Sequence, residues 1–178
     1  MVKKRGYTIW FTGLSASGKT TISHCLEKEL MEHLESKLHV IDGDYMRKTI
    51  NRDLGYTREQ RNIATERIAY VAKILNDNGI ICIVSNISQD KGIRTHIRKI
   101  IEDFVLVYVD TPVEVCAQRC YKGHYEKAIN GEVKDFVGIT EEYEKPDDAE
   151  IIIDTLSTSP EKAADIIVNY LKKCGKVD

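Results

Sequence analysis

A run of glycine, hydroxyl and lysine residues near the start of the chain has the spacing of a phosphate-binding loop. Residues 13–20 read Gly-Leu-Ser-Ala-Ser-Gly-Lys-Thr and match the pattern Gly-x-x-x-x-Gly-Lys-Ser/Thr at every specified position. Gly13 and Gly18 allow the backbone to turn so that successive N–H groups surround an anion. Lys19 can neutralise the β- and γ-phosphates of a nucleotide, and the Thr20 hydroxyl can ligate Mg²⁺. The loop therefore predicts a site for a nucleoside triphosphate with Mg²⁺.

An acidic turn at residues 41–47, Ile-Asp-Gly-Asp-Tyr-Met-Arg, supplies further groups that could do chemistry. The glycine permits a tight turn, so the carboxylates of Asp42 and Asp44 can face the same phosphate. One carboxylate can accept the proton of a substrate hydroxyl while the other anchors Mg²⁺, and we assign the metal to Asp44 together with Thr20. Arg47 can bind an anionic substrate. The alternative is an ordinary Asp-Gly turn in which Asp44 caps a helix, and the phosphate-binding loop favours the catalytic interpretation.

Both motifs follow short apolar segments that have the composition of buried strands. These segments are rich in Ile, Val and aromatic residues, as strands covered on both faces should be. Because the carboxyl ends of parallel strands meet at one edge of a sheet, the loop and the acidic turn should lie together. The predicted strands are Thr8–Thr12, Leu38–Ile41, Ile80–Val84, Phe104–Val109 and Glu150–Ile153.

Segments of helical periodicity alternate with these strands. The alternation predicts an α/β fold of the P-loop NTPase type, with a five-stranded parallel sheet flanked by helices, in one domain spanning residues 1–178. One segment, at about residues 120–148, breaks the alternation and carries many charges and three glycines. We predict that it is a lid that keeps water from the site, the alternative being a surface loop. The predicted helices are Lys19–Glu35, Thr57–Asn78, Ile93–Ile101, Pro112–Arg119 and Pro160–Lys173.

Composition and charge argue against several classes of protein. The 26 basic and 28 acidic residues give no basic excess for nucleic acid, and apolar runs such as residues 80–84 are far too short to cross a bilayer. Five cysteines without a Cys-x-x-Cys pair argue against a disulfide framework or structural zinc, so we expect a cytoplasmic protein. The Asn-Lys-x-Asp motif of GTP-binding proteins is missing, and residues 80–84 are followed by Ser-Asn rather than a Walker B acid. An ATP-dependent kinase fits better than a GTPase or a mechanical ATPase.

Several longer motifs are spread over roughly residues 5–155. They are Gly-Tyr-Thr-Ile-Trp-Phe-Thr-Gly-Leu-Ser at 6–15, Asp-Gly-Asp at 42–44, Asn-Arg-Asp-Leu-Gly-Tyr at 51–56, Ile-Ser at 87–88, Lys-Gly-His-Tyr at 122–125, Gly-Glu at 131–132 and Phe-Val-Gly-Ile at 136–139. Together these motifs make the chain resemble the adenylyl-sulfate kinases. Such enzymes transfer the γ-phosphate of ATP to the 3′-hydroxyl of adenylyl sulfate with Mg²⁺. The resemblance implies the same activity here, and it implies that the chain could form a homodimer, as relatives often do.

The resemblance also implies roles for individual residues. Lys19, Asp42, Asp44 and Ser88 match catalytic positions, although the phosphoserine often assigned to the serine matching Ser88 is not needed for direct in-line transfer. Nucleotide contacts are implied for Gly13, Leu14, Ser15, Ala16, Ser17, Gly18, Lys19, Thr20, Thr21 and Arg119. Acceptor contacts are implied for Asp42, Asp44, Arg47, Tyr56, Arg61, Ile87, Ser88, Lys122 and Phe136, with Tyr56 and Phe136 clamping the base.

Four positions depart from the family pattern, namely Tyr56, Ala64, Glu66 and Gln89. Typical members carry an acceptor-contacting Asn where this chain has Ala64, so either Asn62 or Gln89 substitutes for it, the acceptor differs, or the change is neutral. The sequence leaves open the same chemistry on cytidine diphosphoramidate, a substrate of some relatives in capsule biosynthesis. A non-catalytic nucleotide-binding domain and an RNA-end or nucleoside kinase are weaker alternatives, because the catalytic residues are intact and no basic surface is indicated.

Overall fold

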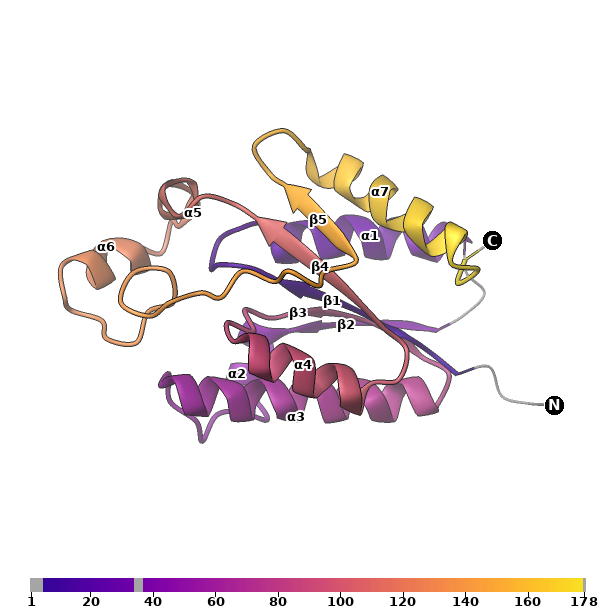
Figure 1. Ribbon diagram of the computed structural model, residues 1–178, viewed down its shortest axis with the longest axis horizontal. Coiled ribbons are helices and arrows are strands. Elements are labelled where there is room, and N and C mark those ends of the chain that lie inside the picture. Colours follow the sequence, from indigo (N-terminus) through magenta and orange to yellow (C-terminus); the bar gives the residue numbers. More distant parts are fainter. Residues whose placement is uncertain (1–4, 34–36, 178) are drawn as a thin grey trace.

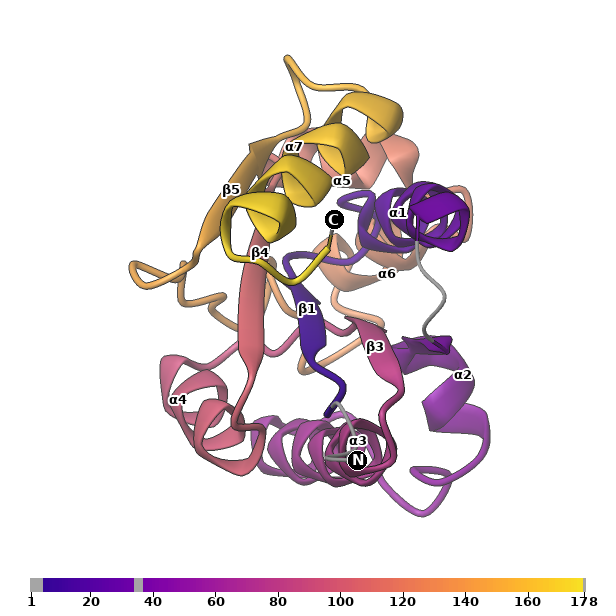
Figure 2. The same cartoon turned by 90° about the vertical axis from the view of Figure 1, so that its right-hand side faces the viewer.

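A computed structural model describes residues 5–33 and 37–177 and shows a parallel sheet between two helical layers (Figure 1). The strands run in the order β2-β3-β1-β4-β5, and every neighbouring pair is parallel. Helices α1 and α7 cover one face, and α3 and α4 cover the other (Figure 2). The predicted P-loop NTPase fold class is therefore confirmed. The strands are β1 (Thr8–Thr12), β2 (Leu38–Asp42), β3 (Ile81–Ser85), β4 (Phe104–Asp110) and β5 (Ile151–Asp154).

The helices agree with prediction for the long elements and differ for the short ones. Two six-residue helices, α2 and α6, were not predicted, because neither is long enough to show a helical period. The part of the first predicted helix at residues 34 and 35 lies outside the described residues. The helices are α1 (Lys19–His33), α2 (Gly43–Lys48), α3 (Arg58–Asp77), α4 (Lys91–Ile100), α5 (Val113–Arg119), α6 (His124–Ile129) and α7 (Pro160–Lys173).

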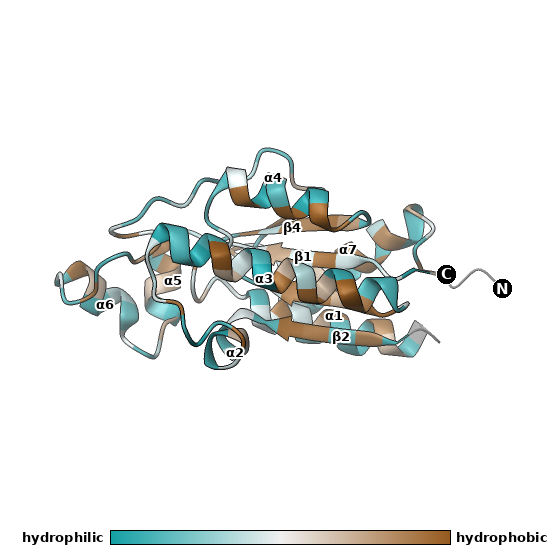
Figure 3. Cartoon of the chain, turned by 90° about the horizontal axis from the view of Figure 1, so that it is seen from below, coloured by the Kyte–Doolittle hydropathy of each residue, from teal (hydrophilic) through white to brown (hydrophobic). Residues whose placement is uncertain are grey.

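Strand β1 shows why the apolar runs are continuous rather than alternating. The side chains of Ile9 and Phe11 pack in the core beneath α1 and α7, whereas Trp10 packs in the second core beneath α3 and α4. All three are fully buried, because both faces of the sheet are covered. Figure 3 shows the hydrophobic strands behind the mixed surfaces of α3 and α4.

Local signals fix where the long helices begin and end. The Thr57 hydroxyl accepts from Gln60 N at the start of α3, and Gly79, with φ of 78°, follows its end. The Ser159 hydroxyl accepts from Lys162 N at the start of α7, where Pro160 occupies the first turn as predicted. Within the described ranges, no helix is both long and apolar enough to cross a membrane.

All the strands end at the same edge of the sheet, and the loops and short helices that follow them extend beyond that edge. The phosphate-binding loop follows β1, the acidic turn follows β2, and helices α5 and α6 extend beyond the end of β4 (Figure 1). Residues 120–148, predicted to be a lid, consist of α6 and an irregular return toward β5. The residues selected from the sequence therefore gather at one end of the molecule.

Candidate active site

The phosphate-binding loop folds around the side chain of its own lysine. Lys19 Nζ donates to the carbonyl oxygens of Gly13 and Leu14, at 3.0 and 2.6 Å, and the residue is 8% exposed. Burial lowers the pKa of Lys19 to about 8, against the opposing effect of nearby acidic groups. Gly13 has φ of 149°, and a Cβ there would lie 2.6 Å from Val109 O, so the loop requires glycine.

The rest of the loop has the strained, enclosed backbone expected of an anion site. Ala16 has a positive φ of 57°, and buried Ser17 receives a hydrogen bond on its carbonyl from the Thr111 hydroxyl at 3.0 Å. The Tyr125 hydroxyl donates to Ser15 O at 2.7 Å, which joins α6 to the loop. The loop then enters α1, whose N-terminus is suited to an anion, with Thr21 exposed on its first turn.

The acidic turn meets the phosphate-binding loop through Asp42 rather than Asp44. The Thr20 hydroxyl donates to Asp42 Oδ2 at 3.0 Å, while Asp42 Oδ1 accepts from the N–H groups of Asp44 and Tyr45. Asp42 is therefore the N-cap of α2, and the alternative in which Asp44 caps a helix is wrong. The side chain of Asp44 is 85% exposed and has Lys122 Nζ 3.8 Å away. The two carboxylates thus have different environments.

Two arginines flank an exposed aromatic ring beside this turn. The guanidinium carbons of Arg47 and Arg61 lie 4.9 and 5.2 Å from the ring centroid of Tyr56, which is 58% exposed. Arg47 donates to Gly55 O at 2.8 Å. Burial lowers the pKa of both guanidinium groups. A flat, anionic molecule would find cation–π surface and positive charge together here.

Arg61 also connects the two segments that carry the predicted aromatic clamp. Its Nε donates to Tyr56 O at 2.8 Å and its Nη2 donates to Asp135 O at 2.9 Å. The next residue, Phe136, is half-buried and packs edge-to-face on Tyr125 with ring centroids 4.8 Å apart. The structure therefore brings the segments of Tyr56 and Phe136 together.

The loop after β3 turns its serine toward the core. Ser88 is 3% exposed, and its hydroxyl oxygen accepts from Trp10 Nε1 at 3.0 Å and from Asn86 Nδ2 at 3.1 Å. The neighbouring Ile87 is half-buried, and its carbonyl accepts from the Thr12 hydroxyl at 2.6 Å. Ser88 thus lies beside the predicted acceptor site but presents its hydroxyl inward, which argues against a phosphorylated serine.

On the far side of the loop, Arg119 reaches the end of β5. Its guanidinium donates to the hydroxyl and carbonyl oxygens of Thr155 at 3.1 and 3.2 Å. Thr155 Oγ1 also lies 2.7 Å from the hydroxyl of Thr111, which contacts the phosphate-binding loop. Arg119 is therefore connected to the loop only through Thr155 and Thr111, on the side opposite to the acidic turn.

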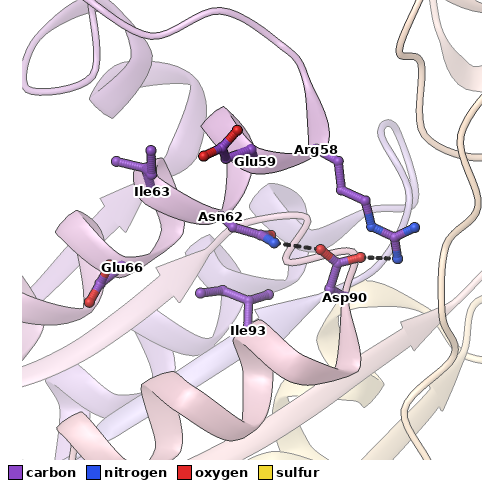
Figure 4. Close-up of a pocket in the computed structure, with 7 residues that line it drawn as sticks. All are labelled: Arg58, Glu59, Asn62, Ile63, Glu66, Asp90 and Ile93. Carbon is purple, nitrogen blue, oxygen red and sulfur yellow. Dashed lines mark hydrogen bonds and ion pairs between the residues drawn. The ribbon is translucent and has the colours of Figure 1, made fainter.

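Glu66, one of the four unusual positions, and Asn62, a candidate substitute for the missing amide, both make contacts away from the predicted acceptor site. Asn62 Nδ2 donates to Asp90 Oδ2 at 2.6 Å, and Glu66 pairs with His96 at 3.0 Å. Asn62, Glu66 and Asp90 line a cavity of about 440 Å³ between α3 and α4 (Figure 4). Because the Asn62 amide is hydrogen-bonded to Asp90, it does not replace the family's Asn side chain that is missing at the buried Ala64.

One residue that sequence reasoning missed is Asn86, directly after β3. Its Nδ2 donates to Thr65 Oγ1 at 2.8 Å as well as to Ser88. A Cβ on Gly43 would lie 2.9 Å from Asn86 Oδ1, so this amide packs against the acidic turn. A polar residue at the end of a buried strand was the available signal.

Gln89, another unusual position, is 2% exposed, and no described residue hydrogen-bonds either of its side-chain polar atoms.

Comparison with known proteins gives consistent matches. The family model described as adenylylsulphate kinase matches residues 5–154. The adenylyl-sulfate kinase of Clostridium acetobutylicum is 45% identical over 97% of this chain and 86% of that protein, and that of Rippkaea orientalis is 42% identical over 98% and 96%. The solved Mycobacterium tuberculosis APS kinase CysC, in complex with AMPPNP and APS, has a TM-score of 0.89 and 35% identity, covering 94% of this chain and 98% of that one.

Proposed function

The chain belongs to the adenylylsulphate kinase family, and from this premise we propose that it transfers the γ-phosphate of ATP to the 3′-hydroxyl of adenylyl sulfate. The bond between the γ-phosphorus and the bridging oxygen breaks, a bond from the 3′-oxygen to that phosphorus forms, and the hydroxyl proton leaves to a base. The products are ADP and 3′-phosphoadenylyl sulfate. The observation that carries this proposal is the Thr20–Asp42 hydrogen bond of 3.0 Å, which joins the triphosphate loop to the acidic turn.

We assign the magnesium position to Thr20 and Asp42. Mg²⁺ prefers oxygen ligands and usually takes one or two from protein alongside phosphates and water, which fits a hydroxyl and a carboxylate in contact. Among the described residues no cluster of three or more acidic, histidine or cysteine side chains forms a dedicated metal cage. When bound, Mg²⁺ would neutralise charge on the transferring phosphoryl group. The sequence predicted Asp44 as the carboxylate ligand of the metal, and this proposal assigns that role to Asp42 instead.

Asp44 is then the residue available as the general base. Its exposed carboxylate has no helix-capping bond and faces Lys122 at 3.8 Å, so it is free to accept the proton of an incoming hydroxyl. Lys19 supplies positive charge to the phosphates that leave with ADP. Positioning and charge neutralisation provide most of the acceleration in such a transfer.

The acceptor is proposed to bind across the acidic turn from the phosphate-binding loop. Tyr56 and Phe136 would contact its base, while Arg47, Arg61 and Lys122 would bind its phosphate and sulfate oxygens. Ile87 lines the same region. Arg119 would lie near the adenine of ATP, because it borders the opposite side of the loop.

We further propose that transfer is direct and that no phosphoserine forms. The Ser88 oxygen already accepts two hydrogen bonds from buried donors, and attack on ATP would require it to leave the core. Ser88 instead holds the loop after β3 in place.

Ala64 stands where typical family members carry an acceptor-contacting Asn, so a second acceptor is to be tested, cytidine diphosphoramidate. The purified protein is incubated with ATP, Mg²⁺ and each nucleotide, and ADP and the phosphorylated product are measured. We expect turnover of adenylyl sulfate at least about tenfold above that of the second acceptor. Turnover of cytidine diphosphoramidate alone would identify that nucleotide as the acceptor. Absence of ADP formation with either nucleotide would refute the proposed kinase activity.

The assembly and the compartment are also proposals. The homologous APS kinase of Thiobacillus denitrificans is hexameric, and the apolar side chains of Tyr70 and Ile74 are half or more exposed on α3, so we propose that this chain self-associates, at least as a homodimer. All five cysteines are free thiols, which suits a reducing cytoplasm. Light scattering of the purified protein tests the assembly.

A further inference from the structure

The first helical turn of α4 is capped from an unexpected place. Asp90 occupies the N-cap position, where an aspartate ordinarily accepts from backbone N–H groups of its own helix. Here its side chain makes no such bond. It turns instead toward α3, where Asp90 Oδ2 accepts from Asn62 Nδ2 at 2.6 Å and Asp90 Oδ1 pairs with Arg58 Nη2 (Figure 4). The local capping interaction is given up for a contact with another helix.

Glu144, from the return of the predicted lid, supplies the missing cap. Glu144 Oε2 accepts from Lys91 N, the first amide of α4, at 2.7 Å. Glu144 Oε1 accepts from Arg58 Nη2 at 2.6 Å, and Glu144 N donates to Gln89 O at 3.0 Å. Arg58 therefore bridges two carboxylates from segments that are far apart in the sequence. We call Arg58, Asp90 and Glu144 the three-segment junction.

Each arm of the junction lies a short distance along the chain from a proposed acceptor contact. Arg58 stands two residues after Tyr56, Asp90 stands two residues after Ser88, and Glu144 stands eight residues after Phe136. These three segments carry the two aromatic residues and the Ile87–Ser88 loop of the proposed acceptor site. A shift at the junction would alter the separation of the two aromatic rings without touching the phosphate-binding loop.

We propose that Arg58 is a positioning residue that sets the geometry of the acceptor clamp through the junction. This inference rests on the proposed function. The Arg58 and Glu144 side chains are 42% and 37% exposed, so this ion pair contributes little to global stability. The Asp90 side chain is 9% exposed, but it keeps its hydrogen bond from Asn62 when Arg58 is removed. Small misplacement of a substrate can nevertheless cost a large factor in rate or affinity. Loss of Arg58 should therefore weaken acceptor binding far more than it weakens the fold.

The kinetic test compares the wild type with Arg58→Ala, Arg58→Lys and the control Lys73→Ala, which removes an exposed ion pair to Asp77 farther along α3. For Arg58→Ala we expect the KM for adenylyl sulfate to rise about five- to twentyfold, with the KM for ATP within twofold. Arg58→Lys should recover only part of the loss, because both carboxylates contact the single nitrogen Nη2, and a lysine ammonium would have to take its place on a shorter side chain. Equal changes in both KM values, or no change in either, would overturn the proposal.

A second measurement does not depend on which acceptor is used. Amide hydrogen exchange of residues 136–144, without substrates, should be at least about fivefold faster in Arg58→Ala than in wild type or Lys73→Ala, because the return segment loses an anchor. Asp90→Asn should give the same direction of change. Unchanged exchange would refute the junction even if the enzyme proves active. Faster exchange in an enzyme inactive on both acceptors would keep the junction and reject the proposed function.

Discussion

Lys19 should destabilise the folded protein at neutral pH, and replacing it with methionine tests this. Lys19 is 8% exposed as a residue, and burial lowers the pKa of its ammonium group from 10.5 to about 8. A lysine whose folded pKa is below its unfolded pKa favours folding when deprotonated, so its penalty is full below about pH 8 and disappears as the pH rises toward 10.5. A shift of this size corresponds to about 3 kcal/mol at pH 7 and about 1 kcal/mol at pH 9.5.

Two effects of Lys19→Met oppose each other at pH 7. The buried charge is removed, but the carbonyl oxygens of Gly13 and Leu14 lose their donor, at a cost of about 1 kcal/mol each. We therefore expect the variant to be about 1 kcal/mol more stable than wild type at pH 7 while losing nucleotide binding. The buried charge of Lys19 is needed for function rather than for stability, because in the proposed site it contacts the phosphates of ATP.

The assay is urea unfolding of both proteins at pH 7 and pH 9.5. Between these values the free energy of unfolding of wild type should gain about 2 kcal/mol relative to Lys19→Met. The cysteines and tyrosines titrate in both proteins, and their contributions cancel in the difference except at Cys116, where burial raises the pKa and Lys19 lowers it. Lys73→Met, at a half-exposed lysine, is the matched control, and its free energy of unfolding should change with pH as that of wild type does. A constant difference between wild type and Lys19→Met across this range would refute the reasoning.

Three further predictions concern the site. Asp44→Asn should lower kcat at least about 100-fold with little change in ATP affinity, measured by steady-state kinetics and calorimetry, and turnover near wild type would contradict its role as base. Ser88→Ala should lose about 1–3 kcal/mol of stability, measured by denaturation, because buried Trp10 Nε1 loses its acceptor, yet it should keep at least about a tenth of wild-type activity. No phosphoenzyme should be found by intact mass after mixing wild type with ATP, and detection of one would restore Ser88 as a nucleophile. Asn86→Leu should raise the KM for the acceptor about tenfold and leave the KM for ATP within twofold, because the Asn86 amide joins the acidic turn to Thr65. Equal changes in both KM values would show that Asn86 does not act at the acceptor site.

Much of the fold could be predicted because its signals are local. Residues 9–11 and the predicted run Phe104–Val109 are continuously apolar, which identifies strands of a sheet covered on both faces. The helices α2 and α6 could not be predicted, since six residues show no period. Their positions depend on contacts such as Thr20 with Asp42 and Tyr125 with Ser15, which join residues distant in the sequence.

The amino-acid sequence alone determined the phosphate-binding loop and the presence of two carboxylates on one tight turn, because backbone freedom at glycine and the chemistry of lysine and aspartate are properties of short segments. Tertiary structure decided which aspartate meets Thr20, where the Ser88 hydroxyl points, and that Asp90 leaves its own helix to pair with Arg58. A polar side chain near the end of a strand can satisfy its hydrogen bonds in several ways. The choice among them is made by partners on other segments, brought within reach only when the sheet and its two helical layers have formed.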